Sequence, residues 1–146
     1  MEKIINPKPI NKSNFSDFGD VITTKDIEPI EINNGYAKRF DGIANLDTKE
    51  QNGEATISIF SALKRNFPMK ETTFLVLVAP KGDSPVIEKI QSFIVPPGIG
   101  INYKPGTWHF PLISTENMNF LVVDRKGSGE NLVIENLEEK KIVLKY

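Results

Sequence analysis

The sequence Phe74-Leu-Val-Leu-Val-Ala79 is the most continuous apolar segment of the chain. Apolar residues without a polar interruption are typical of a β-strand that is covered on both faces. Turn-forming residues at positions 80–84 end the segment. We therefore expect residues 74–79 to form the central strand of the core.

The segments around this strand also have strand-like patterns. Residues 54–60 alternate, so that Ala55, Ile57 and Ile59 share one face, which is the pattern of a half-buried strand. Residues 30–40 are predicted to form either one strand or two strands broken at Asn33-Asn34-Gly35, where Asn-Gly favours a tight turn. Further strands are predicted at residues 119–124, 132–134 and 142–144. A short helix is predicted at residues 13–18, and a second begins at residue 84 and runs into a strand near Ile94.

Many short strands separated by Gly/Pro turns, with little helix, favour a sandwich or a small barrel. The length of 146 residues fits one domain with a single core. We therefore predict an all-β fold with short helices, a cupin-like jelly-roll β-barrel that occupies residues 1–146 as one domain.

Charge and composition exclude several classes of function. The 18 basic and 19 acidic side chains give a formal net charge of -1, and no basic run marks a nucleic-acid or membrane surface. The chain has no Cys, which removes disulfides and thiol chemistry and fits the cytoplasm. The first nine residues lack the apolar core of a signal peptide, and no apolar run is long enough to span a bilayer. We expect a soluble protein whose partner is a small molecule or another protein.

Residues 98–112 gather the side chains best suited to a ligand site, including the only Trp and the only His of the chain. His109 is the natural general acid or base, because imidazole has an ordinary pKa near neutrality. The alternative is a core histidine beside Trp108. Asn102, Tyr103 and Lys104 can bind and orient a small anion, so we predict that this stretch forms a pocket wall.

Other candidates have an ordinary structural interpretation as well. Trp108 is expected to supply an apolar wall. Arg39 and Arg125 can hold a carboxylate with their two-pronged guanidinium groups, or can form surface ion pairs. Asn33 and Asn102 can orient hydroxyl or amide groups, although Asn beside Gly is usually turn chemistry. Because the chain has one His, we predict no bound metal and no cofactor, while a weakly bound divalent metal held by His with Asp or Glu stays open.

Several segments, taken in order, resemble one enzyme family. They are Ile32-Asn-Asn-Gly35 with Arg39-Phe40, Gly100-Ile-Asn-Tyr103 with Gly106-Thr-Trp-His109, and Phe120-Leu-Val-Val-Asp-Arg125. This order is similar to that of the ureidoglycolate lyase family. The resemblance implies a cupin-like β-barrel, usually a homodimer, that cleaves ureidoglycolate to glyoxylate and urea in allantoin (purine) catabolism.

The chain departs from the family pattern at two places. The sequence Trp108-His109-Phe110-Pro111 has Phe where the family usually has a second His. Between Asn66 and Phe67, a family segment with a Glu-Arg-His-Pro motif and a Ser-Gln-Ala-Phe motif has no counterpart. Either this segment is deleted in the protein or the sequence omits it. Site residues of that segment cannot be transferred to this chain.

The resemblance implies an elimination that needs an acid/base group and a cation. We expect His109, Tyr103 and Lys104 to be catalytic, with the substrate carboxylate held by Arg39 or Lys104. Tyr103, Asn33 and Asn102 would hydrogen-bond the hydroxyl and urea groups. The alternatives are a non-catalytic cupin-like protein that binds a small carboxylate or acts as a regulatory paralogue, and a metal-independent sugar or keto-acid isomerase.

Overall fold

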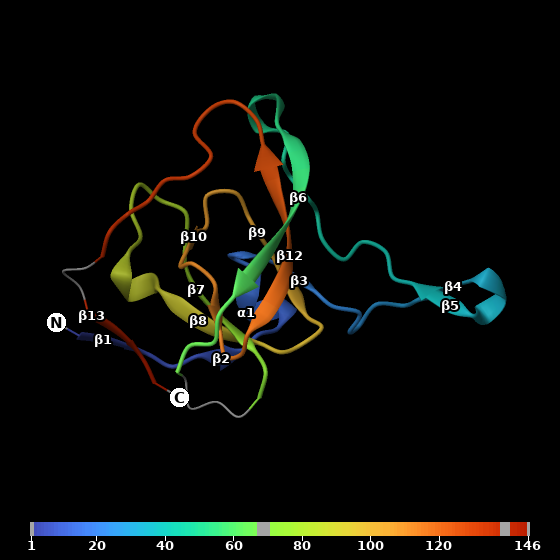
Figure 1. Ribbon diagram of the computed structural model, residues 1–146, viewed down its shortest axis with the longest axis horizontal. Helices are drawn as coiled ribbons and strands as arrows, with labels where there is room; N and C mark the ends of the chain where they lie inside the picture. The colour runs from blue at the N-terminus through green and yellow to red at the C-terminus, as the bar shows by residue number, and fades with distance from the viewer. Residues whose placement is uncertain (1, 67–70, 138–140, 146) are drawn as a thin grey trace.

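The computed structural model describes residues 2–66, 71–137 and 141–145, and most of its regular structure is β-strand (Figure 1). This confirms the predicted all-β class. The strands are β1 (Glu2–Ile5), β2 (Lys8–Pro9), β3 (Gly19–Ile22), β4 (Ile30–Ile32), β5 (Ala37–Arg39), β6 (Glu54–Ala62), β7 (Phe74–Ala79), β8 (Gln91–Val95), β9 (Gly100–Tyr103), β10 (Trp108–His109), β11 (Ile113–Ser114), β12 (Met118–Lys126) and β13 (Lys141–Leu144). The helices are α1 (Lys12–Phe15) and the 3-10 turns η1 (Asn33–Gly35), η2 (Glu50–Asn52) and η3 (Ile87–Lys89).

The predicted central strand is confirmed as β7. It pairs antiparallel with β8 on one edge and with β10 and β11 on the other. Its side chains pack into a core that is centred on Phe15, Phe18 and Phe93, each at most 1% exposed. The rings of Phe15 and Phe93 meet edge to face at 5.4 Å, a favoured arrangement of aromatic pairs. Burial on both faces explains why residues 74–79 carry no polar side chain.

Helix α1 and strand β3 connect this core to strand β9. The side chain of Asn11 accepts a hydrogen bond from the backbone N–H of Asn14, which caps α1 and places Phe15 in the core. Strand β3 then pairs antiparallel with β9. A Cβ atom at Gly19 would collide with the carbonyl oxygen of Asn102. Glycine at this position therefore allows β9 to lie close against β3.

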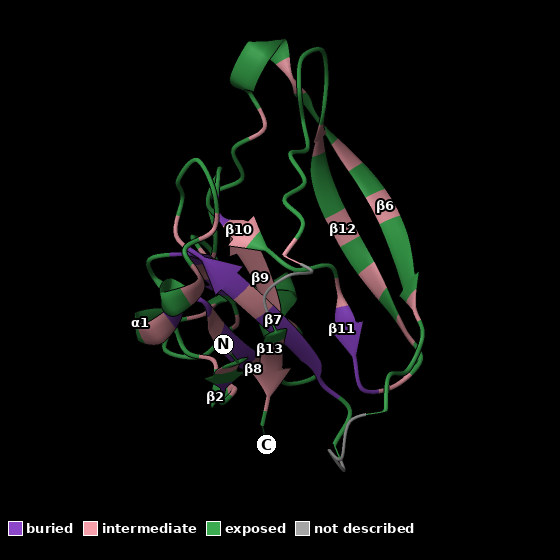
Figure 2. Ribbon diagram, turned by 90° about the vertical axis from the view of Figure 1, so that its left-hand side faces the viewer, coloured by how far each residue is buried: buried purple, intermediate pink, exposed green. Residues whose placement is uncertain are grey.

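Strands β6 and β12 form a long two-stranded ribbon, with Phe60 opposite Phe120. Phe120 attaches the ribbon to the core, because its ring meets that of Phe74 edge to face at 5.1 Å. The predicted strand at residues 54–60 is confirmed, but its burial differs from the prediction. Ile57 and Ile59 are 70% and 61% exposed, so the apolar face is the exposed one (Figure 2). The reason is that no further layer covers this face among the described residues.

Of the two alternatives predicted for residues 30–40, the structure shows two strands. Strands β4 and β5 pair antiparallel around η1, where Asn33, Asn34 and Gly35 all have positive φ values. This conformation suits Gly and is tolerated by Asn, which explains the Asn-Asn-Gly sequence. We call residues 30–39 the hairpin arm. Figure 1 shows that the arm stands away from the rest of the molecule.

Two predictions of secondary structure were wrong. Residues 132–134 form no strand and are exposed, because no described strand lies beside them to pair with. The helix predicted from residue 84 is only the turn η3 at Ile87–Lys89, since pairing of Gln91 with Val78 already begins strand β8. The strand predicted near Ile94 is confirmed as β8. The predicted break between Asn66 and Phe67 borders residues 67–70, which lie outside the described residues. No helix in the described part of the chain is both long and apolar enough to cross a membrane.

Candidate active site

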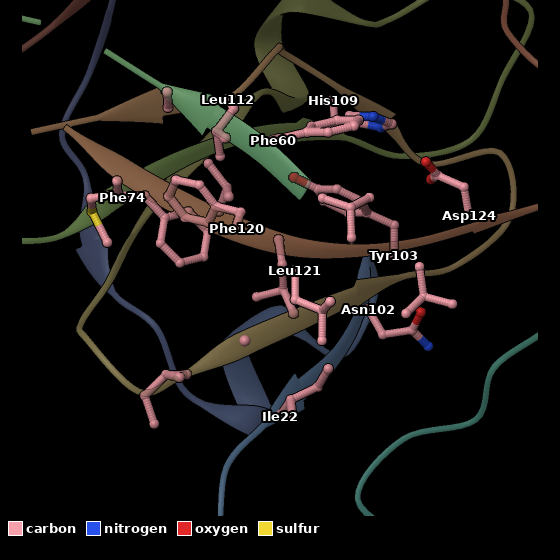
Figure 3. Close-up of a pocket in the computed structure, with 18 of the residues that line it drawn as sticks. Ile22, Phe60, Phe74, Asn102, Tyr103, His109, Leu112, Phe120, Leu121 and Asp124 are labelled. Atoms are coloured by element: carbon pink, nitrogen blue, oxygen red, sulfur yellow. The ribbon is translucent and has the colours of Figure 1, made fainter. Parts of the chain in front are cut away.

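A cavity of about 1000 Å³ lies between the ribbon and strand β9, and it is open to solvent (Figure 3). Residues 98–103 and 109–112 line one side, as predicted for the stretch at residues 98–112. The ribbon lines another side with Phe60, Phe120 and Asp124. The lining therefore combines apolar surface with a few polar side chains, which is the usual composition of a small-molecule site.

His109 and Tyr103 form a stacked pair in the cavity wall. Their ring centroids are 4.3 Å apart and the rings are inclined by 14°. The pairing of β10 with β7 fixes His109 opposite Val78, and Tyr103 packs on Phe15 of the core. The two side chains thus come from different strands, β10 and β9, and both strands are held against the hydrophobic core.

The hydrogen bond of His109 determines which ring nitrogen faces a ligand. Its Nδ1 atom lies 3.1 Å from the carbonyl oxygen of Thr107. Because a carbonyl oxygen only accepts, Nδ1 carries the hydrogen, and the lone pair of the neutral ring is on Nε2. Figure 3 shows the nitrogen-bearing side of the ring directed toward the part of the cavity that contains Asp124. A neutral His109 can therefore accept a proton through Nε2.

Tyr103 has a different chemical character. Burial raises the pKa of its phenol well above the ordinary value, because the charged phenolate would lose its hydration. Tyr103 therefore remains a neutral phenol at neutral pH. It can donate a hydrogen bond to a ligand oxygen but is unsuited to act as a base.

Asn102 joins the cavity wall to the segment that follows the hairpin arm. Its side-chain Nδ2 donates to the Asp20 carboxylate at 3.1 Å and to the carbonyl oxygen of Asn45 at 2.8 Å. The Asp20 carboxylate also accepts a hydrogen bond from the backbone N–H of Asn45, at 3.3 Å. The amide hydrogens of Asn102 are thereby used within the protein, and its carbonyl oxygen is the atom left to face a ligand.

The guanidinium group of Arg125 also has structural partners. Its Nε atom donates to the carbonyl oxygen of Glu50 at 2.7 Å, and Nη2 donates to that of Ser128 at 2.8 Å. Its Nη1 atom lies 3.3 Å from the side-chain oxygen of Asn131. Arg125 lines the cavity, but these contacts direct its donors toward two surrounding loops.

Four predicted site residues lie outside the cavity lining. The ammonium group of Lys104 donates to the carbonyl oxygen of Ser16 at 2.6 Å, and the indole of Trp108 donates to that of Gly82 at 3.0 Å. Their neighbours Tyr103 and His109 do line the cavity. Trp108 and His109 are successive residues of β10 and point to opposite faces, whereas Lys104 follows the last residue of β9. The other two are Arg39 and Asn33, which are both in the hairpin arm.

The cavity also contains acidic residues that were not predicted, Asp47 and Asp124. Asp124 lies in the segment Phe120–Arg125 that resembles the family, but no site role was predicted for it. The alternation of strand β12 was the signal that could have identified it, since it places Asp124 on the same face as Phe120. Within the described residues, no group of three His, Asp or Glu side chains is arranged to hold a metal ion.

The fold and the cavity define an all-β protein with a small-molecule site built around one imidazole. Comparison with known proteins identifies its family. The sequence model of the ureidoglycolate lyase family matches residues 2–70 and residues 66–144. The ureidoglycolate lyase of Pseudomonas paraeruginosa is 38% identical, over 85% of this chain and 85% of that protein. The ureidoglycolate lyase of Pseudomonas putida strain F1 is 36% identical, over 94% and 93% of the two chains. The chain belongs to the ureidoglycolate lyase family.

The family match also supports the predicted gap. It is divided into two parts that meet at residues 66–70, where the family segment was predicted to be missing. The alignment with the Pseudomonas paraeruginosa protein extends over 143 positions, whereas 85% of 146 residues is about 124. About 19 positions of that relative, the difference between these two numbers, therefore have no counterpart in this chain.

Proposed function

We propose that this protein is a ureidoglycolate lyase, which cleaves ureidoglycolate to glyoxylate and urea and serves allantoin degradation. Family membership over nearly the whole chain is the observation that carries this proposal. The cavity supports it, because His109 supplies a proton acceptor beside the neutral donor Tyr103. We further propose that the enzyme is a cytoplasmic homodimer.

The reaction needs one proton to move between two positions of the substrate. Ureidoglycolate has a hydroxyl group and a urea nitrogen on the same carbon. When a base removes the hydroxyl proton, the oxygen forms the carbonyl group of glyoxylate, and the carbon–nitrogen bond breaks with its electron pair going to nitrogen. Protonation of that nitrogen completes urea. In this proposal, Nε2 of His109 takes the hydroxyl proton and returns it to the departing nitrogen.

Two further residues orient the substrate in this mechanism. The Tyr103 phenol donates a hydrogen bond to the hydroxyl oxygen as its negative charge develops. The side-chain oxygen of Asn102 accepts a hydrogen bond from the urea group. Lys104 and Trp108 have no direct part, since their polar atoms bind Ser16 and Gly82 instead. We also propose that the reaction needs no metal, and activity that survives prolonged treatment with a chelator would agree with this.

The decisive experiment measures urea release from ureidoglycolate by the wild type and by His109→Ala. Loss of a well-placed acid/base group is expected to lower kcat by about 10²- to 10⁴-fold. Circular dichroism of the variant checks that the fold is retained. A loss of less than about threefold in a folded variant is incompatible with the proposed role of His109.

A second candidate function is non-catalytic binding of a small carboxylate. The observation that favours it is the interrupted family match at residues 66–70, because the absent family segment contains acidic and imidazole side chains. Calorimetry with glyoxylate, combined with the urea assay, distinguishes the two functions. Binding without urea release identifies a binding protein, whereas urea release identifies the lyase.

A further inference from the structure

The hairpin arm is connected to the cavity at its base but extends away from it. Leu46 and Asp47, which follow the arm in the chain, line the cavity, and Asn45 is hydrogen-bonded to Asn102 in its wall. From this base the arm extends outward (Figure 1). Tyr36, beside the turn, is 89% exposed. Such an extended hairpin with exposed apolar side chains is suited to contact another molecule.

The total surface of the chain is large for a monomer. The accessible surface is 10640 Å². A compact monomer of 16.4 kDa is expected to expose about 7,500 Å². The excess of about 3,000 Å² is more than one subunit needs to contribute to an obligate dimer interface, which is about 1,000 to 2,500 Å². The chain therefore has enough uncovered surface to form a stable interface with a second copy.

Among its described lining residues, the cavity has negative side chains but no available positive one to hold a substrate carboxylate, and a second copy could supply it. A substrate carboxylate would meet Asp47 and Asp124 in the cavity. Arg125 is the one Lys or Arg among the described lining residues, and its donors are bound to backbone and side-chain oxygens of two loops. The side chain of Arg39 in the arm is 63% exposed. Among the described residues, its one ion-pair partner is the neighbouring Asp41, at 2.8 Å. The cavity thus needs a cation, and the arm carries an accessible one.

We propose that two copies of this chain exchange their arms, so that the arm of one copy closes the cavity of the other. This proposal rests on the proposed function, because it assigns Arg39 to the substrate carboxylate and Asn33 to its hydroxyl or urea group. A two-fold interface uses the same surface on both subunits. Because each arm starts at its own cavity, two cavities that face each other across a two-fold axis receive each other's arms. The active site is then composed of residues from both copies.

Mixing two variants that are each strongly impaired tests this arrangement. Arg39→Ala removes a two-pronged contact and is expected to lower kcat/KM about 10- to 100-fold, and His109→Ala lowers it further. After co-refolding of the two variants in equal amounts, half of the dimers contain one chain of each kind. One of their two cavities combines His109 with an intact arm from its partner. We expect urea release to recover to about a quarter of the wild-type rate.

The control variant is Lys38→Ala, whose side chain lies on the opposite face of strand β5 from that of Arg39. We expect this variant to keep wild-type activity. If the mixture of Arg39→Ala and His109→Ala forms mixed dimers but recovers no activity, arm exchange is overturned. The presence of mixed dimers is checked with a different affinity tag on each chain.

A second measurement does not depend on activity. The chain has no Cys, so Tyr36→Cys accepts a single nitroxide spin label. This labelled variant, without isotope, is mixed with ¹⁵N-labelled wild type. We expect the label to broaden the amide signals of Tyr103 and His109 in the ¹⁵N-labelled copy, and to leave those of β1 and β13 sharp.

The two measurements separate failure of this proposal from failure of the proposed function. Broadening at the cavity supports arm exchange, and its absence at concentrations where the dimer forms overturns it. Elution of the wild type as a monomer at the protein concentrations of the activity and spin-label measurements overturns it too. A wild type that releases no urea rejects the lyase function, and the spin-label result then decides arm exchange by itself.

Discussion

Strands β7 and β6 are both rich in apolar residues, but they have opposite environments. Val76 and Val78 of β7 are at most 4% exposed, whereas Ile57 and Ile59 of β6 are more than 60% exposed. Strand β7 is paired on both edges and covered by aromatic side chains, while β12 is the one partner of β6 among the described strands (Figure 2). An apolar pattern thus shows that a strand has a face to bury, but the neighbouring elements decide whether it is buried.

The largest expected difference between the two regions is in stability. Phe93→Ala removes a fully buried ring from the core and is expected to lower the free energy of unfolding by about 3 to 5 kcal/mol. Ile57→Ala removes an exposed side chain of the ribbon, so a change within about 0.5 kcal/mol is expected. Urea unfolding of the two variants measures both values. Equal losses would mean that the ribbon is as well packed as the core.

A smaller effect is expected where the core meets the cavity. Gly19→Ala places a methyl group against the carbonyl oxygen of Asn102 and is expected to lower the free energy of unfolding by about 1 to 3 kcal/mol. Because it displaces β9, it should also lower urea release. Gly82→Ala is the matched control, since its nearest neighbour is 3.5 Å away at the carbonyl oxygen of Ser84. Thermal unfolding and the urea assay should leave this control unchanged.

A third prediction concerns pH and the burial of Tyr103. Its pKa is raised in the folded protein, so the unfolded chain loses this proton first as the pH rises above about 10. The stability present at lower pH is then lost by up to about 1.4 kcal/mol per pH unit. Tyr103→Phe lacks this loss. Urea unfolding of both proteins between pH 9 and about 11 checks it, and parallel curves would show that the phenol is not buried.

The smallest effect is expected on the exposed face of the ribbon. Ile59→Thr keeps a β-branched side chain and replaces an exposed methyl-bearing group with a polar one, so stability should change by less than about 0.5 kcal/mol. The same replacement at Val76 introduces a hydroxyl group into the core and should cost about 1 to 3 kcal/mol. Thermal unfolding of the two variants compares them. A large loss at Ile59 would reveal a contact that covers this face.

The sequence predicted local structure where a physical requirement is contained within a few residues. The Asn33-Asn34-Gly35 turn needs positive φ values, and these residues supply them. The alternation at residues 54–60 correctly predicted a strand, but period alone cannot tell which face has a covering layer. Residues 132–134 had a strand-like composition and formed no strand, because a strand also needs a partner.

The candidate site was predictable to the extent that it is contained in one stretch. Asn102, Tyr103 and His109 line the same cavity, as the stretch at residues 98–112 indicated. Lys104 was placed with them by proximity in sequence, although it follows the last residue of β9 and its ammonium group binds the carbonyl oxygen of Ser16. Asp124 was overlooked because the cavity brings together residues that are far apart in the chain.

The hydrogen bond between His109 and the carbonyl oxygen of Thr107 has a consequence for how the ring is held during a turnover. In many hydrolases a carboxylate orients the catalytic imidazole. Here the orienting oxygen belongs to the backbone two residues earlier in the chain, at 3.1 Å, so the segment that positions the ring also fixes its orientation. If the ring turned over, a carbon atom would face this oxygen and the bond would be lost. Nε2 can therefore take a proton and return it within one turnover without a movement of the ring.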